Sequence, residues 1–150
     1  MKKILVSACL LGEKVRYDGN SQQQHHVMLN KWQQQGRIIS ICPEVAGGLT
    51  IPREPAEIQP DSRVITQKGI NVGHQFLLGA EKALFLCQKY EIRYALLKES
   101  SPSCGSHTIY DGTFSNSKIS GMGVTAALLE ENGIQVFSEH QIDELNHLLN

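Results

Sequence analysis

The sequence has no long apolar run, little net charge and no closely spaced pair of cysteines. None of its apolar stretches approaches the roughly 18 residues that a membrane-spanning helix needs. Its 14 Lys and Arg residues nearly balance 15 Asp and Glu residues, which gives a formal charge of −1. A charge so close to zero, with no basic cluster, argues against a protein that binds nucleic acid or a membrane surface. We therefore expect neither nucleic acid nor a membrane as a partner.

The composition that is present is that of an ordinary globular protein, with 150 residues, 41% apolar and 19% charged. A chain of this length buries roughly 68–70% of the surface that it exposes when unfolded, so it needs no disulfides. We expect one domain over residues 1–150. The segment between Lys3 and Cys9 resembles a lipoprotein signal, but it is shorter than the roughly 7–15 apolar residues of a secretory signal. We therefore predict a cytoplasmic protein with reduced cysteines.

The apolar residues alternate between strand-like and helix-like patterns. Continuous apolar segments predict buried strands at residues 3–8, 37–41, 92–97 and 134–137. Apolar residues at helical spacing predict helices at residues 22–35, 75–90 and 124–131, and Ser138 with Gln141 predicts a capping box that opens a last helix. Residues 42–73 hold four of the five prolines and predict a long functional loop, with short β pieces around residues 64–66.

This alternation predicts an α/β fold. We expect a mainly parallel sheet of about four or five strands, joined by right-handed crossovers and covered by helices on both faces. Sheets of this kind bind ligands beyond the carboxyl ends of their strands. Residues directly after the predicted strands are therefore the first candidates for a functional site.

Three of the four cysteines follow predicted strands. Cys9 ends the first strand, Cys42 ends the second, and Cys104 lies just past the third. They are far apart in the chain, but their thiols converge at one sheet edge if the three strands are neighbours. Cys87 instead lies on the apolar stripe of a predicted helix, where a free cysteine typically fills the core.

Converging thiolates repel one another unless a cation lies between them, and a bound metal supplies that charge. Thiolates select zinc, copper(I) or an iron–sulfur centre. Three cysteine ligands leave one coordination position open, which is typical of a catalytic site. The alternative is three small buried residues that never bind a metal. The spacing does not decide between them, because no Cys-x-x-Cys pair is present.

Residues beside these cysteines add candidate chemistry. Glu44, two positions after the second cysteine, is either a general base with a raised pKa or a solvated loop acid. Ser101 and Ser103, beside the third cysteine, either bind a substrate or cluster sulfides, or only form a turn. Gly48 either lets the backbone approach a ligand closely or forms a turn.

Seven motifs occur in order along the chain. They are S-A-C-L-L-G (7–12), V-R-Y-D-G (15–19), C-P-E-V-A-G-G-L (42–49), P-R-E-P-A-E (52–57), S-P-S-C-G (101–105), I-Y-D-G-T-F (109–114) and G-M-G-V-T-A (121–126). Over nearly the whole chain this set resembles the thiouracil desulfurase family. The resemblance implies a Rossmann-like domain with a [4Fe–4S] cluster held by Cys9, Cys42 and Cys104. The fourth iron is then free of protein ligands.

The resemblance also implies an enzyme that converts 2-thiouracil to uracil without net redox chemistry. The open iron takes the thiocarbonyl sulfur, water attacks the activated carbon, and sulfur leaves as hydrosulfide. Glu44 is implied as the acid/base that handles the water and Ser101 as a substrate contact, with Ser103 and Gly48 as further predicted substrate-binding residues. The expected partner is a small-molecule thiobase, and the expected assembly is a monomer or weak homo-oligomer.

Three other hypotheses compete with the desulfurase interpretation. A Cys3His zinc site with His107 as the fourth ligand would be a closed site in a structural or binding module without desulfurase activity. A cysteine-nucleophile hydrolase needs one cysteine beside a histidine, so three equivalent cysteines are too many. The pattern G-x-G-x-x-A at residues 121–126 fits a dinucleotide fingerprint, but we expect residues 115–120 not to form the strand that must precede it.

Gly121 and Gly123 are therefore predicted to form a flexible lead-in to a helix, in a position to line the pocket. Arg16, Asp18 and Arg53 lie in motif loops near the same sheet edge. They either contact a pyrimidine or fix the loops, and the sequence does not separate these two roles.

Overall fold

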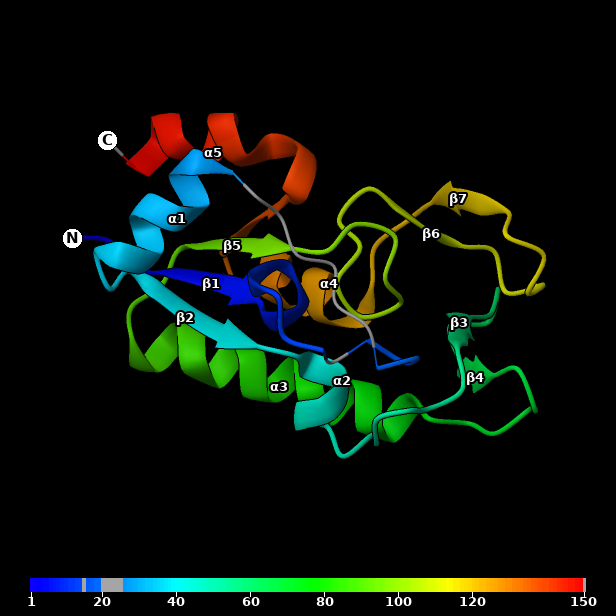
Figure 1. The fold of residues 1–150 in the computed structure, drawn as a ribbon. Coiled ribbons are helices and arrows are strands. Elements are labelled where there is room, and N and C mark those ends of the chain that lie inside the picture. Colours follow the sequence, from blue (N-terminus) through cyan, green and yellow to red (C-terminus); the bar gives the residue numbers. More distant parts are fainter. Residues whose placement is uncertain (15, 20–25, 150) are drawn as a thin grey trace.

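The structure, a computed structural model, describes residues 1–14, 16–19 and 26–149. Within these residues the central sheet has four strands: β1 (Ile4–Ser7), β2 (Ile38–Ile41), β5 (Tyr94–Leu97) and β8 (Gln135–Ser138). Their order is β2-β1-β5-β8, and all neighbouring pairs are parallel (Figure 1). The predicted parallel α/β sheet is confirmed, with four strands. The three strands that precede the candidate cysteines are also adjacent.

Helices cover both faces of this sheet, as predicted (Figure 1). On one face, α1 (Val27–Gln34) and α5 (Ile142–Leu149) pack against Ile4 and Val6 of β1. On the other face, α3 (Gly73–Lys89) and α4 (Val124–Glu131) pack against Leu5 of the same strand. Alternate side chains of a strand point to opposite faces, so a strand covered on both sides is nearly continuous in apolar residues. Cys87 of α3 is 1% exposed, which confirms its predicted place in the core.

Most predicted elements are found within a few residues of the predicted bounds. The helix predicted at residues 124–131 has the bounds of α4. The helix predicted at residues 22–35 is found as α1, and its predicted start at residues 22–25 lies outside the described residues. The capping box of Ser138 and Gln141 is confirmed, and it opens the short 3-10 helix η2 (Glu139–Gln141) that leads into α5.

The long loop and its counterpart after β5 contain short elements, of which the sequence predicted only the β piece at residues 64–66. The first holds α2 (Pro43–Ala46) and the antiparallel pair β3 (Ala56–Ile58) and β4 (Val64–Thr66), and the predicted β piece at residues 64–66 is thus confirmed. The second holds the antiparallel pair β6 (Thr108–Tyr110) and β7 (Lys118–Ser120). The expectation of no strand in residues 115–120 is wrong. All three residues of β7 are exposed, so no apolar pattern in the sequence predicts this strand. β7 belongs to this two-stranded ribbon. The dinucleotide fingerprint therefore still lacks the preceding strand of a central parallel sheet that it requires.

Both ribbons lie beyond the carboxyl ends of β1, β2 and β5 (Figure 1). Glu57 of β3 joins them, because its carboxylate accepts backbone N–H bonds from Gly112 at 2.9 Å and Phe114 at 3.2 Å. Gln59 donates a further bond to the Gly112 carbonyl at 3.1 Å. The ribbons therefore form one wall above the sheet edge.

Among the helices of the described residues, none is long and apolar enough to cross a membrane.

Candidate active site

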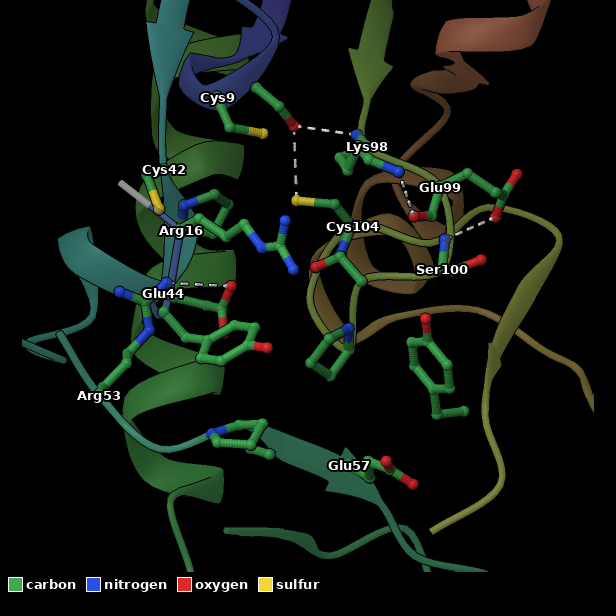
Figure 2. Close-up of a pocket in the computed structure, with 18 of the residues that line it drawn as sticks. Cys9, Arg16, Cys42, Glu44, Arg53, Glu57, Lys98, Glu99, Ser100 and Cys104 are labelled. Atoms are coloured by element: carbon green, nitrogen blue, oxygen red, sulfur yellow. Dashed lines mark hydrogen bonds and ion pairs between the residues drawn. The ribbon is translucent and has the colours of Figure 1, made fainter. Parts of the chain in front are cut away.

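A pocket of about 340 Å³ opens at the carboxyl edge of the sheet, where the strand topology predicts a ligand site. Its floor comes from the residues that follow β1, β2 and β5, and the two ribbons contribute its outer wall (Figure 2). Cys9, Cys42, Glu44, Ser101 and Cys104 all line it. Five residues that the sequence singled out thus share one cavity.

The three thiols reach the pocket from three different elements. Cys9 lies in the 3-10 helix η1 (Ala8–Leu11) directly after β1, Cys42 caps the start of α2 after β2, and Cys104 lies in the turn after β5. Figure 2 shows their side chains around the same end of the pocket. All three are free thiols. The adjacency of the three strands is what brings them together.

Burial controls the charge of these thiols. It raises the pKa of Cys9 to about 12, where the nearby Cys42 adds to the shift and Lys98 opposes it. Burial also raises the pKa of Cys42 and of Cys104. Without a cation the three groups are therefore neutral near pH 7, and a metal centre that binds there must displace their protons.

Glu44 lies in the first turn of α2 and faces the same cavity (Figure 2). Burial raises the pKa of Glu44, and the Arg53 guanidinium, 3.5 Å from its carboxylate, limits the rise. Arg53 also donates to the Thr50 carbonyl at 3.1 Å, and its backbone N–H donates to the Tyr17 carbonyl at 2.7 Å. Arg53 therefore fixes the loops around Glu44, one of the two roles that the sequence left open.

Ser101 organises the turn that carries Cys104. Its hydroxyl oxygen accepts the backbone N–H groups of Ser103 and Cys104, both at 3.1 Å. Both bonds use the oxygen as acceptor, so the hydroxyl proton stays available to a group in the pocket.

Two predicted substrate-binding residues are not brought to the cavity. Ser103 is fully buried, and its hydroxyl shares a 2.7 Å hydrogen bond with Thr125. Gly48 is exposed and lies two residues after the end of α2. Neither lines the pocket, because the Ser103 side chain points into the core and Gly48 lies at the surface. We do not carry either residue into the proposed site.

The geometry does not support a zinc site completed by His107. That side chain is 58% exposed, and its Nδ1 lies 2.9 Å from the Glu99 carboxylate rather than in the pocket. Within the part of the chain that the structure describes, no group of three His, Cys, Asp or Glu side chains is arranged to hold one metal ion. A single zinc ion needs its sulfurs about 2.3 Å away on all sides. A cubane places each cysteine on a different iron, so it accepts a wider spacing.

The comparisons with known proteins agree with this site. The sequence model of the 2-thiouracil desulfurase family matches residues 4–141. The chain belongs to this family. It is 39% identical to the uncharacterized protein YbbK of Bacillus subtilis (strain 168), over 95% of this chain and 99% of that one. Its fold matches a solved structure described as the [4Fe-4S]-dependent thiouracil desulfidase TudS, with a TM-score of 0.97, 52% identity, and coverage of 99% of this chain and 98% of that one. The predicted family and the Rossmann-like fold class are confirmed.

In this member of the 2-thiouracil desulfurase family, a set of charged residues that the sequence did not single out supports the Cys104 loop. Lys98 forms a 2.8 Å ion pair with the buried carboxylate of Glu139. The same carboxylate accepts the backbone N–H of Glu99 at 2.8 Å. These residues follow β5 and β8, and their position directly after strands at the carboxyl edge was the one available signal.

Glu99 holds the loop itself. One of its carboxylate oxygens accepts backbone N–H bonds at 3.0 to 3.2 Å from Ser100, Ser106, His107 and Thr108. Burial alone would raise the pKa of Glu99, but the bonds from His107, Thr108 and Ser100 outweigh it and lower the pKa to about 2. The ionised carboxylate thus closes the loop that contains Cys104.

We expect Glu99→Gln to lower the free energy of unfolding at pH 7 by about 2 kcal/mol, because hydrogen bonds to a charged acceptor are lost. The depressed pKa means that the Glu99 contribution is complete above the ordinary value of 4.5 and is lost as the pH falls toward 2. Urea unfolding at several pH values should therefore show a flatter acid dependence in the variant. Parallel curves for the two proteins would contradict this role.

The glycines before α4 support the same loop and do not line the pocket. The N–H of Gly123 donates to the Gly105 carbonyl at 2.8 Å, and that of Thr125 donates to the Ser103 carbonyl at 2.8 Å. A Cβ on Gly123 would overlap the Ser103 carbonyl and the Cys104 nitrogen. The close approach of α4 to the Cys104 turn thus requires glycine at position 123.

Gly123→Ala is expected to destabilise the chain by about 1–3 kcal/mol, because backbone atoms must move to admit the methyl group. It should also lower the amount of iron that the reconstituted protein retains, since Cys104 moves with the turn. Gly121→Ala is the matched control, because a Cβ there meets only the Ile109 side chain. Thermal unfolding and iron analysis measure both effects, and equal results for the two variants would contradict the account.

Proposed function

We propose that this chain is a [4Fe–4S]-dependent desulfidase that converts 2-thiouracil, or a closely related thiobase, to the oxo compound. The observation that carries the proposal is the meeting of three free thiols from adjacent strand ends in one pocket. Cys9, Cys42 and Cys104 would hold the cluster. When bound, the cluster supplies an iron without a protein ligand, which acts as a Lewis acid toward the thiocarbonyl sulfur.

The donor set supports this assignment. Thiolates are the ligands of iron–sulfur clusters, and three of them leave one iron open. Cys104 is buried and Cys9 and Cys42 are half-buried, so water has limited access to the three sulfurs. The name of the solved structure with 52% identity, a [4Fe-4S]-dependent thiouracil desulfidase, agrees with the same cofactor and substrate.

Glu44 is the proposed general base. Its carboxylate faces the cavity that contains the sulfurs, and the Arg53 guanidinium holds it in place. A carboxylate with a raised pKa takes a proton from water more readily than an ordinary one. As Glu44 takes that proton, the water oxygen bonds to the ring carbon and the C–S bond breaks. One oxygen replaces one sulfur, the sulfur leaves as hydrosulfide, and no electron is gained or lost.

Ser101 is the proposed substrate contact. Its oxygen is engaged by two backbone N–H groups, so its proton is directed to an acceptor on the bound base. Pro102 lines the cavity beside it, Tyr17 lines it from a loop, and Tyr110 lines it from the end of β6. These apolar surfaces suit a flat ring that presents polar edges to Ser101 and Glu44.

Anaerobic reconstitution with iron and sulfide, followed by incubation with 2-thiouracil, tests the proposal. We expect the substrate absorbance to fall while uracil and sulfide form in equal amounts. Protein loaded with zinc is the control and should be colourless and inactive. A reconstituted cluster that turns over no thiobase would contradict the reaction.

We also propose that the enzyme is located in the reducing cytoplasm, where free thiols persist. Its proposed assembly is a monomer or weak homo-oligomer.

A further inference from the structure

We propose that Ser7 is a positioning residue whose hydroxyl donates a hydrogen bond to the Cys104 sulfur and raises the reduction potential of the cluster. The inference rests on the proposed function. Ser7 is the last residue of β1 and is 1% exposed. Its Oγ lies 3.6 Å from the Cys104 Sγ, within the range of a hydrogen bond to sulfur, and Figure 2 marks this bond as a dashed line that ends on that sulfur.

A second hydrogen bond orients the Ser7 hydroxyl. The backbone N–H of Lys98 donates to the Ser7 Oγ at 3.2 Å. An N–H group can only donate, so the Ser7 oxygen is the acceptor in that bond. The one proton of the serine hydroxyl is therefore available to the Cys104 sulfur, which as a deprotonated cluster ligand can only accept.

The donor and the acceptor are both held rigidly. Ser7 ends the strand that lies between β2 and β5, and Lys98 directly follows β5. The Lys98 side chain is anchored by its ion pair with Glu139. On the other side, the backbone N–H of Cys104 is held by Ser101. The bond is therefore built into the sheet edge and does not depend on a mobile side chain.

A hydrogen bond to a ligand sulfur withdraws electron density from it and favours the more negative, reduced state of the centre. Hydrogen bonds to the sulfurs are among the factors that set the potentials of iron–sulfur clusters. Loss of the Ser7 proton should therefore make the cluster harder to reduce. A role confined to packing would leave the potential unchanged.

The experiment compares the reconstituted wild-type chain with Ser7→Ala and Ser7→Thr. Iron and sulfide content are measured first, and the midpoint potential is then determined by an anaerobic redox titration. We expect a more negative potential in Ser7→Ala and a return toward the wild-type value in Ser7→Thr, which keeps the hydroxyl. Ser138→Ala is the matched control, because Ser138 is a buried serine at the end of β8 whose hydroxyl accepts the N–H of His140.

Ser7→Ala with a full cluster and an unchanged potential would overturn the inference, as would an equal shift in Ser138→Ala. If Ser7→Ala folds but retains little iron, Ser7→Thr decides: recovery of iron content and potential supports the role, and failure of folded Ser7→Thr to recover them overturns it. A wild-type chain that takes up no iron overturns the proposed function and this role together. A loaded wild type without thiobase turnover overturns only the reaction.

Discussion

Replacement of any one of Cys9, Cys42 or Cys104 by serine is expected to abolish iron–sulfur cluster binding and thiobase turnover. Each thiol reaches the pocket from a different element, and within the described residues no other cysteine lines it. A serine hydroxyl is a harder ligand with a far higher pKa, so it does not replace a thiolate on iron. Iron and acid-labile sulfide analysis after anaerobic reconstitution measures the loss.

Cys87→Ser is the matched control for these variants. Cys87 is a free thiol of the same chain, buried in α3 between the helix and the sheet, and burial raises its pKa to about 12. The substitution should cost about 1–3 kcal/mol of stability, because it buries a hydroxyl among apolar groups. It should leave the cluster in place. Equal loss of iron from Cys87→Ser, or full iron content in any of the other three, would contradict the assignment.

Glu44→Gln is expected to lower kcat by about 10²–10⁴-fold while the cluster remains bound, the range typical for loss of a general base. Glutamine keeps the shape of the side chain but cannot take a proton from water. Steady-state kinetics with 2-thiouracil, on protein whose iron content has been verified, separates this loss from loss of the cluster.

Glu54→Gln provides the comparison for this second substitution. Glu54 also lines the pocket, but its carboxylate accepts the backbone N–H of Lys68, and we give it no part in the reaction. The kcat of the Glu54→Gln variant should stay within about tenfold of the wild-type value. The general-base role would be wrong if Glu44→Gln retained wild-type kcat, or if both variants lost activity equally.

The sheet and its helices could be predicted from the sequence because buried elements have a recognisable pattern of apolar residues. β1 is buried on both faces, and its first three residues, 4–6, are accordingly apolar, while α4 buries Ala126 and Leu129 at helical spacing. The outer ribbon of β6 and β7 has no such apolar pattern. Lys118 and Ser120 are polar and exposed, and β7 is a strand only because it pairs with β6.

The same distinction applies to the site. The three cysteines could be placed together from sequence because each follows a strand, and strand neighbours share an edge. The partners of Ser7 lie 91 and 97 positions away in the chain, and the pairing of β1 with β5, together with the turn after β5, brings them close. Ser103 shows the reverse case, because proximity to Cys104 in the chain did not bring its side chain into the pocket.

Mössbauer spectroscopy of protein reconstituted with the Mössbauer-active iron isotope, before and after addition of 2-thiouracil, tests the central claim most directly. The account predicts the spectrum of a four-iron cluster in which one iron differs from the other three, and only that iron should change when 2-thiouracil is added. Isolated iron ions, or a cluster whose four irons are all indifferent to the thiobase, would contradict a centre held by Cys9, Cys42 and Cys104 with one open position.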